Sequence, residues 1–146
     1  TEGIVVPANY NTPGQLVISG ATDSVGKVCE ECKKAGAKRA ILLPVNGAFH
    51  SPLMSSAEKQ LGEALDSINF NVPRCPIYQN VVARAINDPD EIRANLKAQL
   101  TGSVRWNQII NVMIKDGATV FYEVGPGRAL QGMIRKIAPE IESTSA

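Results

Sequence analysis

The sequence is organised around residues 45–54, which read Val45-Asn46-Gly47-Ala48-Phe49-His50-Ser51-Pro52-Leu53-Met54. This stretch follows a strand-like run, 39–45, and precedes a helix-like pattern that Pro52 opens with Ser51 as its cap. A junction of strand, loop and helix lets a side chain leave a packed sheet and face a cleft. His50, the only histidine in the sequence, lies in this junction and can exchange protons near neutral pH. We therefore regard His50 as a candidate catalytic group; the alternative is a loop histidine that only forms hydrogen bonds.

The composition is that of an ordinary globular protein. A length of 146 residues suits one domain or part of a larger one, and the hydrophobic fraction of 44% and the charged fraction of 20% are typical. A net charge of +1 gives no electrostatic reason to expect nucleic acid or an acidic membrane as a partner. No apolar run approaches the roughly 20 residues that span a bilayer, and the chain opens without a signal-peptide pattern. We expect a cytoplasmic protein.

The three cysteines, Cys29, Cys32 and Cys75, do not form a disulfide framework, because their number is odd and their spacing is irregular. Cys29 and Cys32 have the Cys-x-x-Cys spacing of redox and zinc sites, but they lie in a helix-like pattern without a second Cys/His pair. We expect free thiols in a reducing compartment and no metal.

The alternation of strand and helix patterns predicts an α/β architecture. We expect a β-rich run from residue 3, further strands over 15–20, 39–45, 77–83 and 118–124, and helices over about 22–34, 52–67, 89–100, 103–115 and 128–137. The first two strands can pair as a hairpin, with a connection over 11–15 longer than the tight type. The run 118–124 is nearly continuous in apolar and β-branched residues, so it should be central in a sheet covered on both faces. Residues from Pro139 onward should fray.

Five motifs then occur in one order along nearly the whole chain. They are Asn9-Tyr10-Asn11-Thr12-Pro13-Gly14-Gln15, Ala35-Gly36-Ala37-Lys38-Arg39, Gly47-Ala48-Phe49-His50-Ser51-Pro52-Leu53-Met54, Gln99-Leu100-Thr101-x-x-Val104-Arg105-Trp106 and Tyr122-Glu123-Val124-Gly125-Pro126-Gly127. Each motif alone is weak. Together they closely resemble the malonyl-CoA:acyl-carrier-protein transacylase family of fatty acid biosynthesis.

The resemblance implies a two-step acyl transfer. A serine takes the malonyl group from malonyl-CoA and passes it to the phosphopantetheine thiol of acyl carrier protein. His50 would act first as general base and then as general acid, and the backbone carbonyl of Gln99 would orient its ring. Asn9, Asn11 and Gln15 match positions that line the cleft; the alternative for these amides is to cap their own loop. No metal or organic cofactor is implied.

The resemblance also bears on substrate choice through Phe49. In malonyl-specific members an aromatic residue before the histidine narrows the acyl pocket, whereas bulkier extender units go with a smaller residue. Phe49 occupies this place. We therefore expect malonyl to be preferred over methylmalonyl.

The resemblance is to the C-terminal half of the family only. The Gly-His-Ser-x-Gly elbow that carries the nucleophile is missing from the sequence, as are the arginine that pairs with the malonyl carboxylate and the oxyanion-hole glutamine. By resemblance, residues 1–51 form the later part of an inserted ferredoxin-like small subdomain, and 52–146 the later part of an α/β-hydrolase-like core. Both are incomplete, because partner strands are missing. We expect a fragment that has no transferase activity without the N-terminal half of the same enzyme.

Two other interpretations stay open. The chain could be a piece of a polyketide-synthase acyltransferase. It could also be an inactive fragment that binds acyl carrier protein through Lys33, Lys34, Lys38 and Arg39, although we favour a solvated helix end as the explanation of these basic residues.

Overall fold

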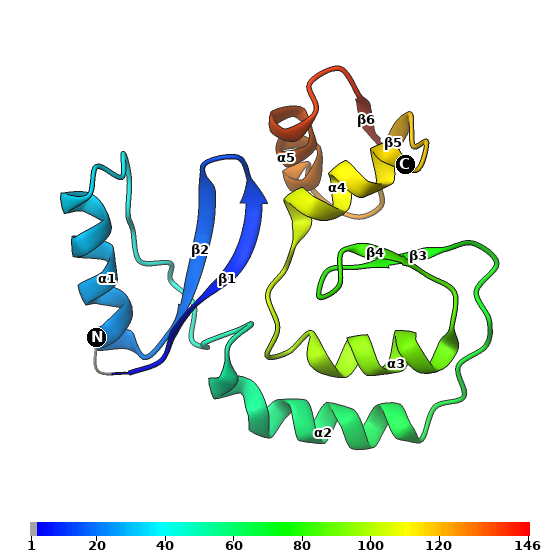
Figure 1. Ribbon diagram of the computed structural model, residues 1–146, viewed down its shortest axis with the longest axis horizontal. Coiled ribbons are helices and arrows are strands. Elements are labelled where there is room, and N and C mark those ends of the chain that lie inside the picture. The colour runs from blue at the N-terminus through cyan, green and yellow to red at the C-terminus, as the bar shows by residue number, and fades with distance from the viewer. Residues whose placement is uncertain (1–2) are drawn as a thin grey trace.

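The computed structural model describes residues 3–146, in which short strands and helices alternate (Figure 1). The elements are β1 (Val5–Thr12), β2 (Gln15–Gly20), α1 (Thr22–Lys34), the 3-10 helix η1 (Pro52–Met54), α2 (Ser55–Asp66), β3 (Ile77–Gln79), β4 (Arg84–Ile86), α3 (Pro89–Ala98), α4 (Trp106–Lys115), β5 (Val120–Glu123), α5 (Ala129–Ile137) and β6 (Glu142–Ser145). Within these described residues the strands form three two-stranded sheets, of which β5–β6 is parallel and the other two are antiparallel. The mixed architecture confirms the predicted α/β class.

The first two strands form a tight hairpin. Only Pro13 and Gly14 separate β1 from β2, and Gly14 has the left-handed φ of +79° that a tight turn requires. The predicted longer connection is wrong, because Asn11 and Thr12 continue β1 up to the turn. Helix α1 follows β2 and lies along the outer side of the hairpin (Figure 1). It begins after Ala21, whose side chain cannot cap the helix.

The main core lies where α4 and α5 meet the β3–β4 hairpin. Ala83, Ile109, Ile110 and Ile134 are buried there, and Ile110 is 0% exposed. Burial of an isoleucine side chain is worth about 1.5–3 kcal/mol. The helix predicted over 103–115 thus supplies two of the buried side chains at the centre of the packing, Ile109 and Ile110.

The linker between α3 and α4 joins this core to the hairpin. Tyr10 N donates to Val104 O at 2.8 Å, and Val104 N donates to Ala8 O at 2.8 Å, which makes a parallel bridge between β1 and the linker. Ser103 Oγ donates to Pro7 O at 2.6 Å. The hairpin is thus attached to the same short segment that follows Gln99.

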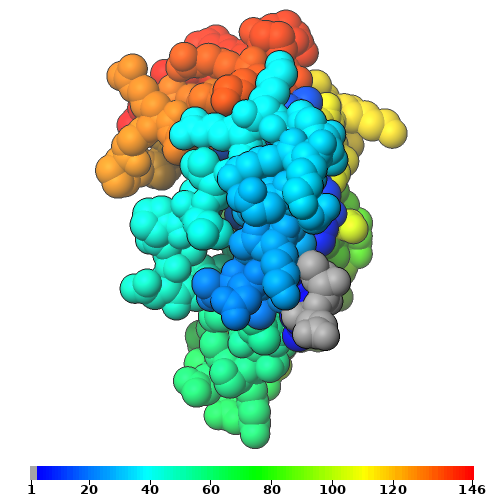
Figure 2. Space-filling view, turned by 90° about the vertical axis from the view of Figure 1, so that its left-hand side faces the viewer, coloured from blue at the N-terminus to red at the C-terminus, as the bar shows by residue number. Residues whose placement is uncertain are grey.

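The predicted strand at residues 39–45 is wrong. Residues 37–48 form no helix or strand, and four apolar side chains there are 50–63% exposed, namely Ile41, Leu42, Leu43 and Val45. Figure 2 shows this irregular segment beside α1 on the outer face. A strand needs partners for its backbone N–H and C=O groups, and no strand among residues 3–146 pairs with this segment. The composition favours a strand, but its partner is not in the described structure.

The strand predicted at 77–83 is also shorter than expected. β3 ends at Gln79, the chain reverses through a turn, and β4 returns antiparallel to it with Ile77 opposite Ile86. Ala83 adopts a left-handed φ of +51° at this reversal. Because the sequence has no glycine at this turn, no local signal marked it.

The C-terminal prediction is wrong in two respects. β5 is not central: Tyr122 is 62% exposed, and Val124, just beyond it, is 85% exposed. Residues 142–145 do not fray but pair with β5, with Val120 opposite Glu142.

Burial raises the pKa of the Glu123 carboxyl, but the N–H groups of Gln131 and Leu130 donate to it and hold the pKa below the ordinary 4.5. This carboxylate closes the N-terminus of α5.

Candidate active site

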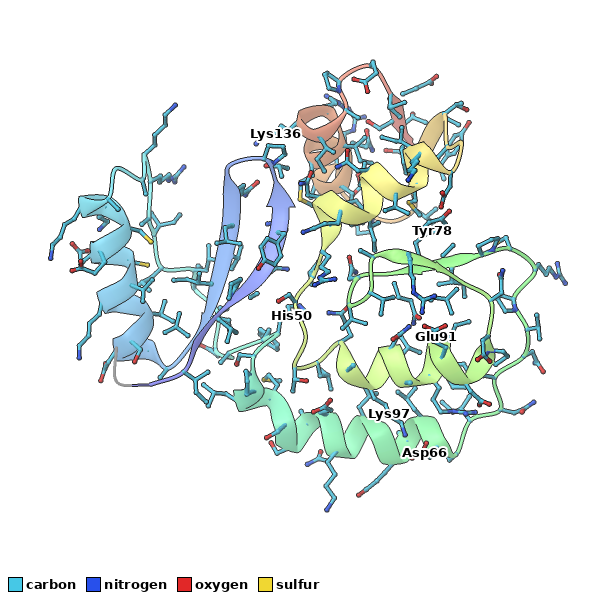
Figure 3. The ribbon with its side chains drawn as sticks, viewed as in Figure 1. His50, Asp66, Tyr78, Glu91, Lys97 and Lys136 are labelled. Atoms are coloured by element: carbon cyan, nitrogen blue, oxygen red, sulfur yellow. The ribbon has the colours of Figure 1, made fainter. Side chains whose placement is uncertain are left out.

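His50 is held at two points by the end of α3. Its ring nitrogen Nδ1 lies 3.0 Å from the carbonyl oxygen of Gln99, and its main-chain N donates to Leu100 O at 3.1 Å. Figure 3 shows the half-buried side chain beside the linker that leaves α3, between the hairpin and the helix pair α2–α3. A carbonyl can only accept, so the neutral ring carries its proton on Nδ1. Nε2 is then left as a proton acceptor.

A tight turn aims this side chain. Ser51 is 0% exposed; its Oγ donates to Ala48 O at 2.6 Å and accepts from Leu53 N at 3.3 Å, as predicted for a cap. His50 has a left-handed φ of +59°, which is rare outside glycine. Such a backbone costs on the order of 1–3 kcal/mol and persists only where neighbouring contacts fix it. Ser51 and Leu100 supply those contacts.

Gln99 takes part through both its backbone and its side chain. It follows α3, whose start is fixed by Pro89 and by Asp88 Oδ1 accepting from Asp90 N at 3.1 Å. Gln99 N donates to Asn95 O at 3.0 Å, and Gln99 Nε2 donates to Gly102 O at 2.9 Å. The family resemblance pointed only to the backbone carbonyl, so the side-chain bond that anchors the loop was not expected.

The amides predicted to line a cleft are not gathered at one point. Asn9 lies on β1 at the bridge to Val104, so it shares the α3–α4 linker with His50. Asn11 is half-buried near the end of β1. Gln15 is exposed next to the hairpin turn, where its Oε1 accepts from Thr12 Oγ1 at 3.5 Å. It lines a hollow of about 420 Å³ together with α4 residues. Figure 3 shows that turn close to α5, away from His50.

Phe49 precedes His50 and is half-exposed. Its ring packs across Gly47 so closely that a Cβ at Gly47 would lie 3.0 Å from the ring carbon Cζ. The other part of the side chain, 51% of the residue surface, faces solvent. Phe49 is thus held against its own loop on one side and is open to solvent on the other.

A hollow of about 470 Å³ adjoins Gln99 on the side of β3. Two buried amides form part of its wall: Asn95 Nδ2 donates to Gln79 Oε1 at 2.9 Å, and Gln79 Nε2 donates to Ile92 O at 3.0 Å. This network fixes the last turns of α3 against β3. The sequence analysis did not identify this network; the available signal was the polar Gln79 inside an apolar strand pattern.

Comparison with known proteins identifies the family of this site. Residues 2–144 match the acyl transferase domain family. The chain belongs to that family. In sequence, this acyl transferase domain is 41% identical over 145 residues to the malonyl CoA-acyl carrier protein transacylase of Haemophilus influenzae, covering 99% of this chain and 46% of the relative. It is 42% identical over 134 residues to the transacylase of Bacillus subtilis, covering 92% and 42%.

Solved structures agree. An acyl carrier protein S-malonyltransferase from Vibrio cholerae superposes with a TM-score of 0.96 at 38% identity, over 100% of this chain and 48% of the other. A malonyl-transacylase in complex with a type II polyketide-synthase acyl carrier protein superposes with a TM-score of 0.94 at 35% identity, over 99% and 47%. The acyl transferase domain described here spans about half the length of the relatives it matches.

The described residues place the His50 ring against the Gln99 carbonyl and leave the other ring nitrogen without a serine partner. Within residues 3–146, the Gln99 carbonyl is the hydrogen-bond partner of the His50 ring, and no serine hydroxyl contacts Nε2. None of the helices in this part of the chain combines the length and apolar character needed to cross a membrane. The acyl transferase domain thus holds the His50 ring in one orientation through the Gln99 carbonyl.

Proposed function

We propose that this chain is the histidine-bearing part of a malonyl-CoA:acyl-carrier-protein transacylase of fatty acid biosynthesis. The observation that carries the proposal is the 3.0 Å contact between His50 Nδ1 and Gln99 O, which presets the ring as a base. The names of the relatives in Haemophilus influenzae and Bacillus subtilis supply the substrates, malonyl-CoA and acyl carrier protein. Free thiols at Cys29, Cys32 and Cys75 are compatible with a cytoplasmic site of action.

In the proposed reaction, His50 Nε2 takes the proton of a serine hydroxyl supplied by a segment outside this chain. The serine oxygen attacks the thioester carbonyl, the carbon–sulfur bond breaks, and the coenzyme A thiolate takes the proton back from Nε2. The thiol of acyl carrier protein then gives its proton to Nε2 and its sulfur attacks the seryl ester carbonyl. The carbon–oxygen bond of the ester breaks, and the serine oxygen takes the proton back from Nε2. The Gln99 carbonyl holds the ring in place through both steps. General acid–base catalysis of this kind contributes about 10²–10⁴-fold.

The thioester brings its own activated acyl group, so the proposed reaction uses no metal or organic cofactor. Phe49 borders the acyl group and favours malonyl over methylmalonyl. Asn9 and Asn11 line the cleft from β1. Gln15, at the hairpin turn, acts at the outer part of that cleft.

In our proposal, residues 1–51 are the later part of a ferredoxin-like small subdomain and 52–146 the later part of an α/β-hydrolase-like core. The three two-stranded sheets and the exposed apolar side chains of Leu42, Leu43 and Val124 support this proposal. A missing partner segment would leave unpaired sheet edges and solvent-exposed apolar side chains. The relatives have about twice the length of this chain, so the partner is the N-terminal half of the same enzyme.

The test is reconstitution. The chain is mixed with the N-terminal half of a transacylase, and malonyl transfer to acyl carrier protein is measured. We expect turnover from the mixture, none from this chain alone, and none with His50→Ala. Robust transfer by the chain alone would show that the nucleophile lies within it and would refute the proposal.

A polyketide-synthase acyltransferase is the second candidate, favoured by the similarity to a transacylase that serves a type II polyketide carrier. Comparing kcat/KM for a fatty-acid carrier and a polyketide carrier in the reconstituted enzyme separates the two. A third candidate, an inactive carrier-binding fragment, has weaker support. Lys33 and Lys34 are already paired with Glu30 and Glu31, at 2.7 Å each. Binding of acyl carrier protein that survives replacement of Lys33, Lys34, Lys38 and Arg39 by Glu would exclude docking through these residues.

A further inference from the structure

The linker that holds His50 is itself irregular, so other contacts must fix it. Residues 99–105 lie between α3 and α4 without helix or strand geometry apart from the bridge at Val104. Yet this segment provides both oxygens that hold His50, the Gln99 carbonyl and the Leu100 carbonyl. A change of a few tenths of an ångström in the Gln99 carbonyl would weaken the contact with Nδ1.

Part of the rigidity comes from within the linker. Gln99 Nε2 donates to Gly102 O at 2.9 Å, and Gly102 N donates to Ala98 O at 2.8 Å. The turn is so close-packed that a Cβ at Gly102 would lie 2.7 Å from Ala98 O and 2.8 Å from Val81 Cγ2. These contacts fix the shape of the turn but not its position relative to the helix that follows His50.

One side-chain contact fixes that position. Thr101 Oγ1 donates to Glu58 Oε1 at 3.2 Å, and both residues are half-buried. Glu58 lies in the first turn of α2, which begins directly after η1 and the His50 turn. The contacts therefore close a ring: His50 to the start of α2, Glu58 to Thr101, and the Gln99 carbonyl back to the imidazole.

We propose that Glu58 and Thr101 are positioning residues that keep the Gln99 carbonyl on His50 Nδ1. Through this contact they hold the neutral imidazole in the form with its proton on Nδ1 and with Nε2 free to accept. The catalytic meaning of the inference rests on the proposed role of His50 as a base. Its structural content, the choice of ring nitrogen that carries the proton, can be measured without any activity.

A second side-chain contact of α2, this one with α3 and not with the linker, provides a matched control. Lys97 Nζ of α3 lies 2.6 Å from Asp66 Oδ1 at the C-terminal end of α2, at the other end of that helix from Glu58 (Figure 3). Loss of this tie also loosens α2 against α3, but it does not touch the linker that carries the Gln99 carbonyl. A merely structural role of Thr101 would make the two losses equivalent.

The experiment uses nitrogen-15 spectra of the neutral imidazole, recorded at alkaline pH. Because His50 is the only histidine, its two ring signals need no further assignment. In the unmodified chain we expect protonated Nδ1 and unprotonated Nε2. Thr101→Val and Glu58→Ala should shift the ratio of the two neutral forms roughly 2- to 10-fold, the range that corresponds to one net hydrogen bond.

Glu58→Gln keeps an acceptor and Thr101→Ser keeps a donor, so both should retain the ratio of the unmodified chain. Asp66→Asn should also leave it unchanged. If Thr101→Val does not fold, Glu58→Ala against Glu58→Gln gives the same comparison. An unchanged ratio in the folded Thr101→Val or Glu58→Ala chain, or an equal shift in Asp66→Asn, would overturn the inference.

The spectra also separate this inference from the proposed function. If the unmodified chain lacks the Nδ1-protonated form, the Gln99 carbonyl does not select which ring nitrogen carries the proton. The Glu58–Thr101 contact would then have no effect on the ring. The opposite result is also possible. If the unmodified chain has the Nδ1-protonated ring and Thr101→Val shifts the ratio, but the reconstituted enzyme does not need His50, then Glu58 and Thr101 position the ring and His50 has no catalytic role.

Discussion

Ser51→Ala tests how the His50 turn is held. Ser51 is fully buried, and its hydroxyl makes two hydrogen bonds, to Ala48 O at 2.6 Å and from Leu53 N at 3.3 Å. Alanine removes both and leaves the two main-chain groups without these partners. At about 0.5–1.5 kcal/mol for each net hydrogen bond, the expected loss in the free energy of unfolding is about 1–3 kcal/mol.

Ser67→Ala is the matched control. The Ser67 hydroxyl also donates to a carbonyl three residues earlier, Ala64 O at 2.7 Å, but it is exposed at the end of α2. Water replaces that partner, so the expected change is within about 0.5 kcal/mol. Urea unfolding of the two variants and the unmodified chain measures both values.

The ring of His50 gives a second readout of the same change. The left-handed backbone of His50 depends on the turn that Ser51 closes, so Ser51→Ala should also weaken the Nδ1 contact and alter the ring nitrogen signals. Equal destabilisation by Ser51→Ala and Ser67→Ala, with His50 signals unchanged in both, would refute the reasoning that the buried hydroxyl holds the catalytic turn.

Three further outcomes are expected. Gly102→Ala should destabilise the chain by about 1–3 kcal/mol, because the new Cβ would lie 2.7 Å from Ala98 O. The control Gly26→Ala has open space around its methyl group and should be neutral or stabilising. Thermal unfolding of the two variants measures the difference. The lowered pKa of Glu123 means that its contribution to stability is present above the ordinary value of 4.5 and is lost as the pH falls through the folded-state pKa. The protection of the first amides of α5 against hydrogen exchange, relative to the unstructured rate at the same pH, should therefore fall below that pH and should be low at neutral pH in Glu123→Ala. Amides that stay protected in the variant would contradict this. Phe49→Ser should raise the use of methylmalonyl-CoA relative to malonyl-CoA in the reconstituted enzyme, and an unchanged preference measured by competition would count against the pocket assignment.

The helices could be predicted because their signals are local. The helices predicted over 89–100 and 103–115 and the Ser51 cap each depend on residues within a turn or two of each other. The predicted bounds therefore differ from the observed ones by only a few residues. The coarse α/β class followed from the alternation of these helices with apolar runs.

The strands could be predicted less well because pairing is not local. Residues 39–45 have the composition of a strand but no partner in the described structure, whereas residues 142–145 look polar and pair with β5. Ala83 and His50 adopt left-handed backbone conformations although neither is a glycine, so the sequence did not mark these two turns. The contact of His50 with the Gln99 carbonyl came from the family resemblance, since no spacing rule joins residues this far apart.

The most direct test of the account is the rate at which the partner serine is acylated. Labelled malonyl-CoA is mixed, in a single turnover, with the N-terminal half of a transacylase and either this chain or its His50→Ala variant. The account predicts that the native chain accelerates formation of the malonyl ester about 10²–10⁴-fold over the variant. Equal rates with both chains would contradict the claim that the preset imidazole activates the nucleophile.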